Sequence, residues 1–295
     1  MTDYYNKKLY YQDGSLNTTI YYKDDDIHKD NGPAIIYYYP NGKIKLERWI
    51  KNGLSHNDNG PAFKSYYENG KVCEVWYYLN DKRHRIDGPA NIEYFSNGKI
   101  HHEVFYLNDN VHNINGPAVV DYSSNGNIIR KNWYVEGRMG NPSNGPQEEK
   151  YFSNKKLKGV FYSKTENRPS ITRFYYSNGN LKEDSICKNN IIHKIRYYKN
   201  EKISFEKYEI FIPNIGTIIA GPHQVSYHTN GQIQQQKWLK NDMVHRLDGP
   251  AVIMYDKQGK ITRQLFYIDS EKISKKEFEK IKKQRELIEK LSGII

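Results

Sequence analysis

Residues 84–118 read HRIDGPANIEYFSNGKIHHEVFYLNDNVHNINGPA. Within this stretch the motif H-x-I-[DN]-G-P-A occurs twice, and Y-x-x-N-G-K-I lies between the two copies. A motif that returns after so few residues indicates an internal repeat, and a repeat determines the fold of the chain that carries it. Gly98, the glycine of the central motif, is the origin for the positions numbered below.

The repeat runs along almost the whole chain of 295 residues. Most units have a tyrosine at position −4, an aliphatic residue at +2 and an aromatic residue at +7. The intervals between origins are 28, 28, 28, 28, 29, 24, 22, 30 and 28 residues, so the sequence predicts ten units. Their origins are Gly14, Gly42, Gly70, Gly98, Gly126, Lys155, Gly179, Glu201, Gly231 and Gly259.

Each unit has the pattern of a β-hairpin. Residues 90–94 alternate apolar and polar side chains, as a half-buried strand does. Asn97 and Gly98 tolerate the positive φ of a tight turn. Residues 100–107 are rich in β-formers and are predicted to run back as one strand, with Asn108-Asp109 as the next turn.

The D-G-P-A segment separates one hairpin from the next. We expect Asp87 to fold its side chain onto the backbone ahead, and Gly88 to adopt a φ that other residues avoid. Pro89 has no N–H for a ladder, so it belongs at the start of a strand. Gly88, Pro89 and Gly98 are therefore predicted to be structural.

The predicted fold is all-β: an elongated, twisted array of about ten stacked antiparallel β-hairpin repeats with a C-terminal capping α-helix. The array covers residues 1–270, with irregular repeats at 151–220, and the helix covers residues 271–295. A globular sandwich is the alternative for so many strands. The near-constant period disfavours it, because Greek-key connections have unequal lengths.

The two ends of the array differ. Ser274 and Glu277 have the spacing of a capping box, and Gly293 suits a helix stop. We expect an apolar stripe on this helix to cover the last hairpin, although a calmodulin-type or membrane-surface helix is an alternative. No helix protects the N-terminal edge, which is a candidate for homodimer formation. The stripe consists of Phe278, Ile281, Leu287, Ile288 and Leu291.

A histidine lies at position +14 of six units, which raises the question of metal binding. Equivalent residues of adjacent units lie about two strand spacings apart, near 9.6 Å. A zinc ion needs its nitrogens within about 2.1 Å, so a metal ladder is disfavoured. We predict a structural role, with each imidazole hydrogen-bonded to the loop backbone. These residues are His28, His56, His84, His112, His193 and His245.

Composition limits the class of protein. The net charge is +11, of which residues 151–210, with 13 Lys/Arg and 6 Asp/Glu, carry +7. A basic excess of this kind invites nucleic acid or anionic lipid as a partner. Cys73 and Cys187 are the only cysteines, which indicates a reducing compartment. Neither a signal peptide nor a membrane-spanning stretch is present, so we expect an intracellular, cytoplasmic protein.

Motifs of catalysis are missing from the sequence. It contains no P-loop, no G-x-G-x-x-G after a strand, no HExxH and no G-x-S-x-G. The sequence therefore predicts no enzyme activity, no cofactor, no metal site and no catalytic residue.

The repeat resembles MORN-type repeats, and most closely the variant class found in bacterial, phage and large DNA-virus proteins. Residues 94–99 (YFSNGK) and 245–251 (HRLDGPA) carry the resemblance, which covers roughly residues 5–270. Plain MORN units of about 23 residues lack the H-x-x-D-G-P segment, and only the stretch from Lys155 to Glu201 is similar to that short form. The resemblance implies an elongated sheet of stacked hairpins, often dimeric, that serves as an interaction scaffold, with lipid binding in some members.

We therefore expect a non-catalytic repeat scaffold that mediates protein–protein interaction. One alternative is nucleic-acid binding through the Tyr/Lys-rich basic middle, because aromatic rings and cations together suit single strands. The other is peripheral attachment to anionic membrane. The candidate partner-binding residues of the middle are Arg196, Tyr197, Tyr198, Lys199 and Lys202.

Overall fold

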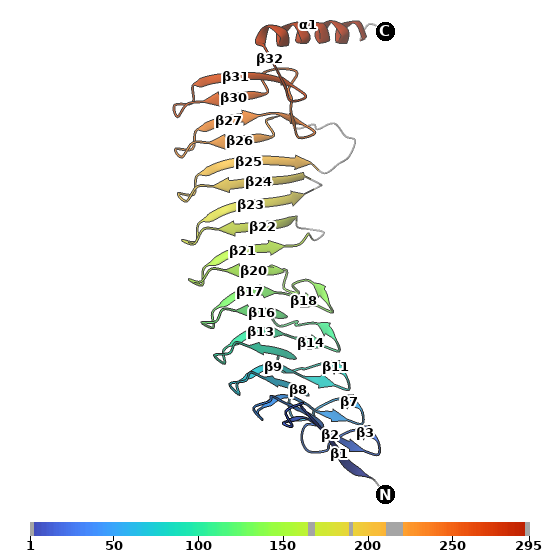
Figure 1. The fold of residues 1–295 in the computed structure, drawn as a ribbon. Helices are drawn as coiled ribbons and strands as arrows, with labels where there is room; N and C mark the ends of the chain where they lie inside the picture. The colour runs from blue at the N-terminus through green and yellow to red at the C-terminus, as the bar shows by residue number, and fades with distance from the viewer. Residues whose placement is uncertain (1–2, 165–168, 189–190, 211–220, 293–295) are drawn as a thin grey trace. The chain divides into compact units, whose positions relative to one another are not determined.

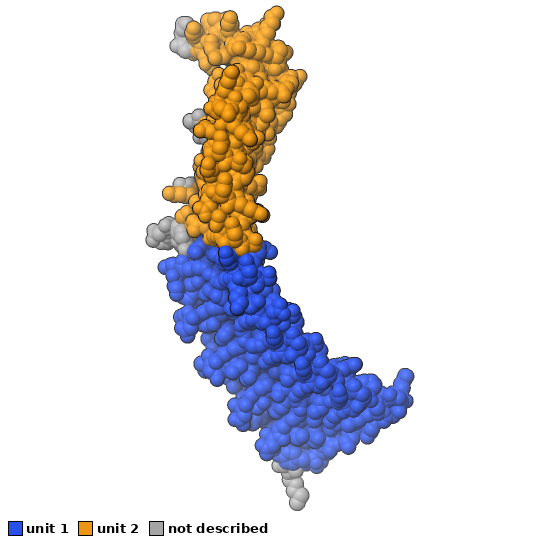
Figure 2. All heavy atoms as spheres, turned by 90° about the vertical axis from the view of Figure 1, so that its left-hand side faces the viewer, with its two compact units in different colours: residues 1–162 blue, residues 163–295 orange. Residues whose placement is uncertain are grey.

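The computed structural model describes residues 3–164, 169–188, 191–210 and 221–292. They divide into two compact units, residues 1–162 and residues 163–295 (Figure 2). Both units consist of stacked antiparallel β-hairpins, and α1 (Lys275–Ser292) follows the last hairpin (Figure 1). The predicted all-β hairpin array with a C-terminal helix is confirmed.

The sheet of unit 1 follows chain order. Each long strand pairs antiparallel with the long strands before and after it. Local connections of this kind make every hairpin a neighbour of the next one in the sequence. The strands are β1 (Tyr4–Tyr10), β2 (Leu16–Lys23), β4 (Ile35–Tyr38), β5 (Ile44–Arg48), β8 (Phe63–Tyr66), β9 (Val72–Trp76), β12 (Asn91–Tyr94), β13 (Ile100–Val104), β16 (Val119–Tyr122), β17 (Ile128–Asn132), β20 (Glu148–Tyr151) and β21 (Leu157–Tyr162).

A second, shorter hairpin follows each long hairpin of unit 1 except β20/β21 among the described residues, and these short hairpins form a column beside the sheet (Figure 1). Neighbouring mini-hairpins are joined by backbone bonds, such as that from Asp109 N–H to Arg83 O at 2.9 Å. They are β6 (Ile50–Lys51) with β7 (Leu54–Ser55), β10 (Tyr78–Leu79) with β11 (Lys82–Arg83), β14 (Tyr106–Leu107) with β15 (Asn110–Val111), and β18 (Tyr134–Val135) with β19 (Arg138–Met139); β3 (Asp26–Ile27) pairs with the end of β2.

The mini-hairpins correct the prediction of a single strand over residues 100–107. The Phe105 N–H still donates to Ala118 O in the sheet at 2.8 Å. From Tyr106 the chain turns out of the sheet and pairs with Val111 instead. Each regular unit therefore contributes two hairpins, and the predicted turn at Asn108-Asp109 closes the smaller one.

Unit 2 begins with longer strands. Within its described residues the long hairpins β22/β23 and β24/β25 carry no mini-hairpin, whereas β26/β27 is followed by one. The strands are β22 (Ser170–Tyr175), β23 (Leu181–Lys188), β24 (Ile191–Tyr197), β25 (Ile203–Ile210), β26 (Gln224–Tyr227), β27 (Ile233–Lys237), β28 (Leu239–Lys240), β29 (Met243–Val244), β30 (Val252–Tyr255), β31 (Ile261–Ile268) and β32 (Glu271–Ile273).

The turns of the ten long hairpins lie at the predicted origins. All ten origin residues have positive φ, including the two that are not glycine, Lys155 (φ 66°) and Glu201 (φ 68°). In each described hairpin the register shifts just before the tyrosine at −4, so a bulge turns that ring toward one face.

Polar side chains connect these turns to one another. The Lys71 Nζ donates to Asn97 O at 2.9 Å, and the Lys99 Nζ donates to Asn125 O at 2.9 Å. The Asn97 side chain also donates to Ser124 O at 3.0 Å. The N-G-K sequence thus serves two purposes: it forms its own turn and it binds the turn of the following unit.

The D-G-P segment works differently from the prediction. The backbone of Gly88 and Gly116 does not have positive φ. A Cβ at residue 88 would lie 3.0 Å from the Arg85 guanidinium carbon, so a larger residue there would require the Arg85 side chain to shift. That guanidinium crosses the loop, bonding Asp87 at 3.0 Å and the Pro89 carbonyl at 3.3 Å. The residue after the histidine, rather than Asp87, therefore holds the loop together.

The helix α1 caps the last hairpin through its first turn alone. The Glu277 N–H donates to Ser274 Oγ at 3.2 Å, as the capping box predicts. Phe278 is buried, and its ring lies 4.7 Å from that of Phe266 in β31. Of the rest of the predicted stripe, Ile281 is partly buried, whereas Leu287, Ile288 and Leu291 are 59%, 64% and 57% exposed and do not cover the sheet. The predicted stop at Gly293 lies outside the described residues.

Candidate binding face

One face of the array carries the side chains that recur between units, together with non-recurring ones such as Glu47 and Lys64. The bulged tyrosine at −4, the aromatic residue at +7 and an alanine at −8 lie on it. The alanine is the backbone partner of the aromatic residue of the preceding strand, as Trp49 N–H to Ala62 O at 2.7 Å shows. The alanines are at most 1% exposed, so their methyl groups are enclosed by the stack. We call this the constant face; its alanines are Ala34, Ala62, Ala90, Ala118 and Ala251.

The polar groups of the constant face are consumed by contacts between units. The Tyr39 hydroxyl donates to Tyr66 O at 2.7 Å, and the Tyr67 hydroxyl donates to Tyr94 O at 2.6 Å. The Tyr66 hydroxyl itself donates to Glu47 at 2.6 Å, and burial together with this carboxylate raises its pKa. These tyrosines therefore stabilise the stack and are not free for a partner.

The histidines at +14 connect each loop to the mini-hairpin of the next unit. The buried His28 accepts a bond from Asn52 N–H at its Nδ1 at 2.9 Å, and its Nε2 pairs with Asp30 at 2.9 Å. Equivalent bonds to the Nδ1 of His56, His112 and His245 come from backbone N–H groups 24 residues further on, at 3.1–3.3 Å. His84 Nδ1 lies 2.9 Å from Asn108 Oδ1.

His193 differs from the rest of the predicted histidine set. In its short unit, position +14 coincides with −8 of the next unit, so the imidazole occupies an alanine slot in β24. It stacks on Tyr208 at 4.2 Å and 6°, and its Nε2 has no hydrogen-bond partner. His223 fills the following alanine slot, also with a buried, unpartnered Nε2, and burial lowers its pKa. His193 thus lies in a strand rather than in a loop, and a bond from this imidazole to a loop backbone remains a prediction.

The opposite face is different in every unit, and we call it the variable face. Cross-strand pairing places positions −7, −5, +4 and +6 on it; Arg48, for example, pairs with Ile35 and Phe63. Within unit 1 no residue type occurs twice at any one of these positions. In unit 1, position −5 is Leu9, Tyr37, Ser65, Glu93, Asp121 and Lys150, and position +4 is Thr18, Leu46, Glu74, His102, Arg130 and Gly159.

The variable face of unit 1 contains an aromatic groove of about 460 Å³. Its walls come from the sheet and from two mini-hairpins, which contribute Ser55 and Tyr78. Arg48 lies in it, 3.4 Å from the Ser55 hydroxyl, and no carboxylate among the described residues pairs with its guanidinium. Trp76 extends the aromatic surface, 6.2 Å from the Tyr78 ring. The other residues that line the groove are Tyr37, Leu46, Ala62 and Phe63.

Further along the same face, charged side chains neutralise one another. His102 Nδ1 lies 2.6 Å from Asp121 Oδ1, and the Arg130 Nε also donates to Asp121. The bond to Asp121 raises the pKa of His102. Burial alone would raise the pKa of Asp121, but the bonds from His102 and Arg130 outweigh it and lower that pKa. Arg130 and Asp121 also line a groove of about 380 Å³.

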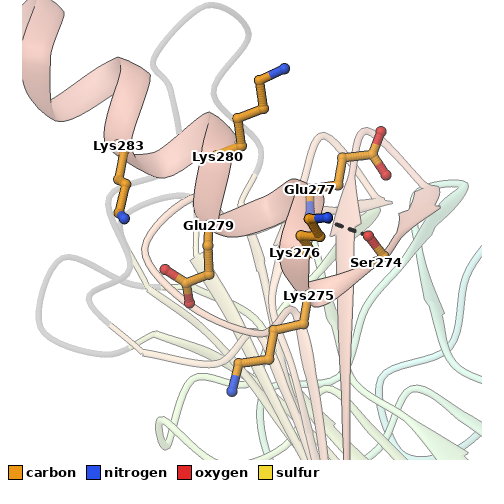
Figure 3. Close-up of a pocket in the computed structure, with 7 residues that line it drawn as sticks. All are labelled: Ser274, Lys275, Lys276, Glu277, Glu279, Lys280 and Lys283. Carbon is orange, nitrogen blue, oxygen red and sulfur yellow. Dashed lines mark hydrogen bonds between the residues drawn. The ribbon is translucent and has the colours of Figure 1, made fainter.

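Beside α1 lies a larger hollow of about 1090 Å³. Figure 3 shows that its side chains project in different directions rather than toward one point. In the described part of the chain no group of three or more His, Cys, Asp or Glu is placed to hold a metal ion. No helix among those residues has the length and apolarity to cross a membrane. The hollow is lined by Ser274, Lys275, Lys276, Glu277, Glu279, Lys280 and Lys283.

The candidate residues of the basic middle gather at the β24–β25 turn, but most are engaged within the array. Arg196 pairs with Glu183 at 2.8 Å. The Tyr198 hydroxyl donates to Tyr227 O at 2.6 Å, and the Lys202 Nζ donates to Asn230 O at 2.9 Å. Tyr197 is partly buried, which raises its pKa, and Lys199 is exposed. Binding of a partner here remains a prediction.

The residues of the groove were not identified from the sequence. Arg48, Phe63 and Trp76 occupy repeat positions without a common residue type, whereas a search for repeats selects the positions that recur. The sequence does contain a signal for them. When the units are aligned, positions that share one sheet face and differ in residue type from unit to unit are not constrained by stacking.

Comparison with known proteins supports the repeat class. Residues 35–48 and 62–80 match the family described as MORN repeat variant. The matched segments contain β4/β5 and β8/β9, and they support a MORN-type repeat protein. MORN repeats are generally found in scaffolds with membrane or protein-interaction roles. No curated protein matches the chain.

Similarity to solved structures is low. The crystal structure of TcdB2-TccC3-TEV is 12% identical, with a TM-score of 0.18, over 90% of this chain and 14% of that one. The crystal structure of TcdB2-TccC3-Cdc42 is 12% identical, with a TM-score of 0.15, over 90% and 17%. The chain thus spans less than a fifth of the length of either protein.

Proposed function

We propose that the protein is a non-catalytic repeat scaffold whose variable face binds a protein partner. The observation that carries the proposal is the division between the two faces. The tyrosine at −4 and the aromatic residue at +7 of the constant face recur because they stack the units, while each position of the variable face of unit 1 has a different side chain at each step. A constant frame that presents non-repeating side chains is how solenoid proteins build extended binding surfaces.

The aromatic groove of unit 1 is the part of this face best suited to hold a partner. Trp, Tyr and Arg dominate the energetics of protein interfaces, and here Trp76, Tyr78 and Arg48 lie together. The unpaired Arg48 contrasts with Lys150 of the same face, which pairs with Glu148 at 3.0 Å. A partner that brings a carboxylate to Arg48 would pair with the guanidinium, and an apolar side chain of the same partner would fill the aromatic groove.

Affinity capture from the native host, read by mass spectrometry, tests the proposal. We expect Trp76→Ala combined with Arg48→Ala to lose the captured protein. Ile86→Ala is the matched control, because Ile86 is 87% exposed but lies in a loop outside the groove. Capture of the same proteins by wild type and the double variant would contradict the groove, and recovery of nucleic acid instead of protein would favour the basic middle.

A second candidate is peripheral attachment to anionic membrane through α1, favoured by its exposed Leu287, Ile288 and Leu291. Lysines of the same helix would add attraction to anionic lipid. Flotation with vesicles of phosphatidylcholine and phosphatidylserine tests it. Leu287→Ser with Ile288→Ser should abolish flotation and Leu54→Ser, at an exposed mini-hairpin residue, should not. Equal flotation of both variants would contradict a role for α1.

A further inference from the structure

The first strand of unit 1 presents an open sheet edge. The Asp24 N–H donates to Asp3 O at 3.0 Å, which fixes the alternation of the β1–β2 ladder. Tyr5, Lys7 and Leu9 therefore direct their backbone groups at β2, while Tyr4, Asn6 and Lys8 direct theirs away from it. No strand among the described residues pairs with that outer side. Such an edge is a template for another strand.

The side chains of β1 provide few obstacles to pairing. Tyr4 and Leu9 are 55% and 52% exposed, and the strand is seven residues long with one irregularity, at its end. Edge strands are commonly protected by proline, by bulges or by lysines. In the middle of β1 the only protection of this kind is the pair Lys7 and Lys8. A strand that pairs with β1 must therefore place groups beside these two lysines that do not repel them.

Charge is separated along this edge. At its beginning the Tyr4 hydroxyl donates to Asp30 at 2.8 Å and the Tyr5 hydroxyl donates to Asp25 at 3.0 Å. Three residues further on come the lysines. Because two antiparallel copies run in opposite directions, the acidic end of each would meet the lysines of the other.

We infer that β1 pairs antiparallel with β1 of a second copy, with the two-fold axis at Asn6. In this register Tyr4 lies opposite Lys8, and Tyr5 lies opposite Lys7, on both sides of the axis. Each lysine then faces a tyrosine whose hydroxyl holds an aspartate. Registers centred on Lys7 or Lys8 would place two lysines directly opposite each other, which is unfavourable. This inference is independent of the partner proposed for the variable face.

Sedimentation velocity of the full chain at rising concentration tests the pairing. A strand pair of this length buries less than the ~1,200 Å² of stable interfaces, so we expect a dimer of two 34.9 kDa chains to dominate by about 100 µM. Asn6→Pro removes two bonds at the axis, one from each copy, and leaves the β1–β2 ladder intact. It should weaken dimerisation at least about tenfold.

Asn6→Ala is the matched control, because it keeps the N–H and should dimerise like wild type. Thermal unfolding verifies that both variants fold. A wild-type chain that stays monomeric at about 100 µM, or equal dimerisation of the proline and alanine variants, would overturn the inference.

Charge exchange tests the register. Lys7→Glu should weaken self-association, as should Asp25→Lys, whereas a mixture of the two variants should recover a dimer, because Lys7 faces the Tyr5 that holds Asp25. Lysine is compatible with the φ of 66° at residue 25, since Lys155 adopts the same value. If the mixture associates no better than either variant alone, the register centred on Asn6 is wrong.

Discussion

The regular repeats of unit 1 and the short repeats at the start of unit 2 build the same long hairpin and connect it differently. A regular unit adds a mini-hairpin, whose backbone donates to the histidine of the preceding loop. In the short units, β23 pairs directly with β24, and this pairing covers more residues than the pairing between neighbouring long hairpins of unit 1. His193 occupies the place of an alanine there. The long hairpin with its bulged tyrosine is therefore the essential element, and the mini-hairpin is an addition that only regular units support.

The alanine slot should separate the two kinds of repeat most strongly. Ala90 is fully buried beside Tyr77, so Ala90→Leu should overpack the constant face and cost about 3 kcal/mol. His193→Ala should be close to neutral, because it removes a ring stack but also an unpartnered nitrogen. Urea unfolding of both variants measures the difference. A tolerated Ala90→Leu would show that the slot is not sterically closed.

The histidine bridge should come next in size. His28→Ala removes a buried ring that bonds through both nitrogens and leaves the Asn52 N–H without its acceptor, which should cost about 2 kcal/mol. Hydrogen exchange at Asn52 should rise together with the loss of stability. His228→Ala is the control, since that partly buried imidazole bonds Tyr255 O at 3.0 Å in unit 2 and does not bridge a loop to a mini-hairpin. An equal loss in both variants would argue against a special role for the bridge.

The turn origins offer a test in the opposite direction. Gly98→Ala forces alanine to φ 90° and should cost about 1 kcal/mol. Lys155→Gly, at φ 66°, should instead stabilise by up to about 1 kcal/mol, because glycine reaches that conformation without strain. Thermal midpoints of the two variants should move in opposite directions, and a common direction would contradict the assignment of residue 155 as an origin.

Two histidines should respond to pH with opposite signs, each by about 1 kcal/mol or less. The pKa of His102 is raised, so its contact with Asp121 stabilises below the unfolded value near 6.5 and is lost as pH rises. The pKa of His223 is lowered, so the unfolded chain binds the proton first and stability falls below about pH 6.5. Relative to wild type, His102→Ala should be less stable at about pH 5.5 than at about pH 8, and His223→Ala should be more stable at the lower pH. Urea midpoints at both values decide this.

The sequence predicted the parts of the fold that depend on local rules. Turn chemistry and strand alternation act within a few residues, so the origins from Gly14 to Gly259 and the cap at Ser274 could be read directly. The mini-hairpin was missed because its strands, such as Tyr106–Leu107, continue the β-pattern of the preceding strand without a break.

Other features depend on neighbouring units and were beyond a local interpretation. The role of Gly88 depends on where the Arg85 side chain crosses the loop. The exposure of Leu287 depends on how far α1 extends past the last hairpin. The groove around Arg48 joins one sheet and two mini-hairpins, and no single segment of sequence contains it.

The side-chain ladder between turns has a consequence for how such a protein changes length. Because Lys71 binds the turn at Asn97 and Lys99 binds the turn at Asn125, removing residues 71–98 would join Gly70 to Lys99 and restore the same contacts one step later. Loss or duplication of 28 codons in reading frame therefore preserves the contacts between turns. The span of the array and the set of side chains it displays can change in whole steps during evolution, without redesign of any junction.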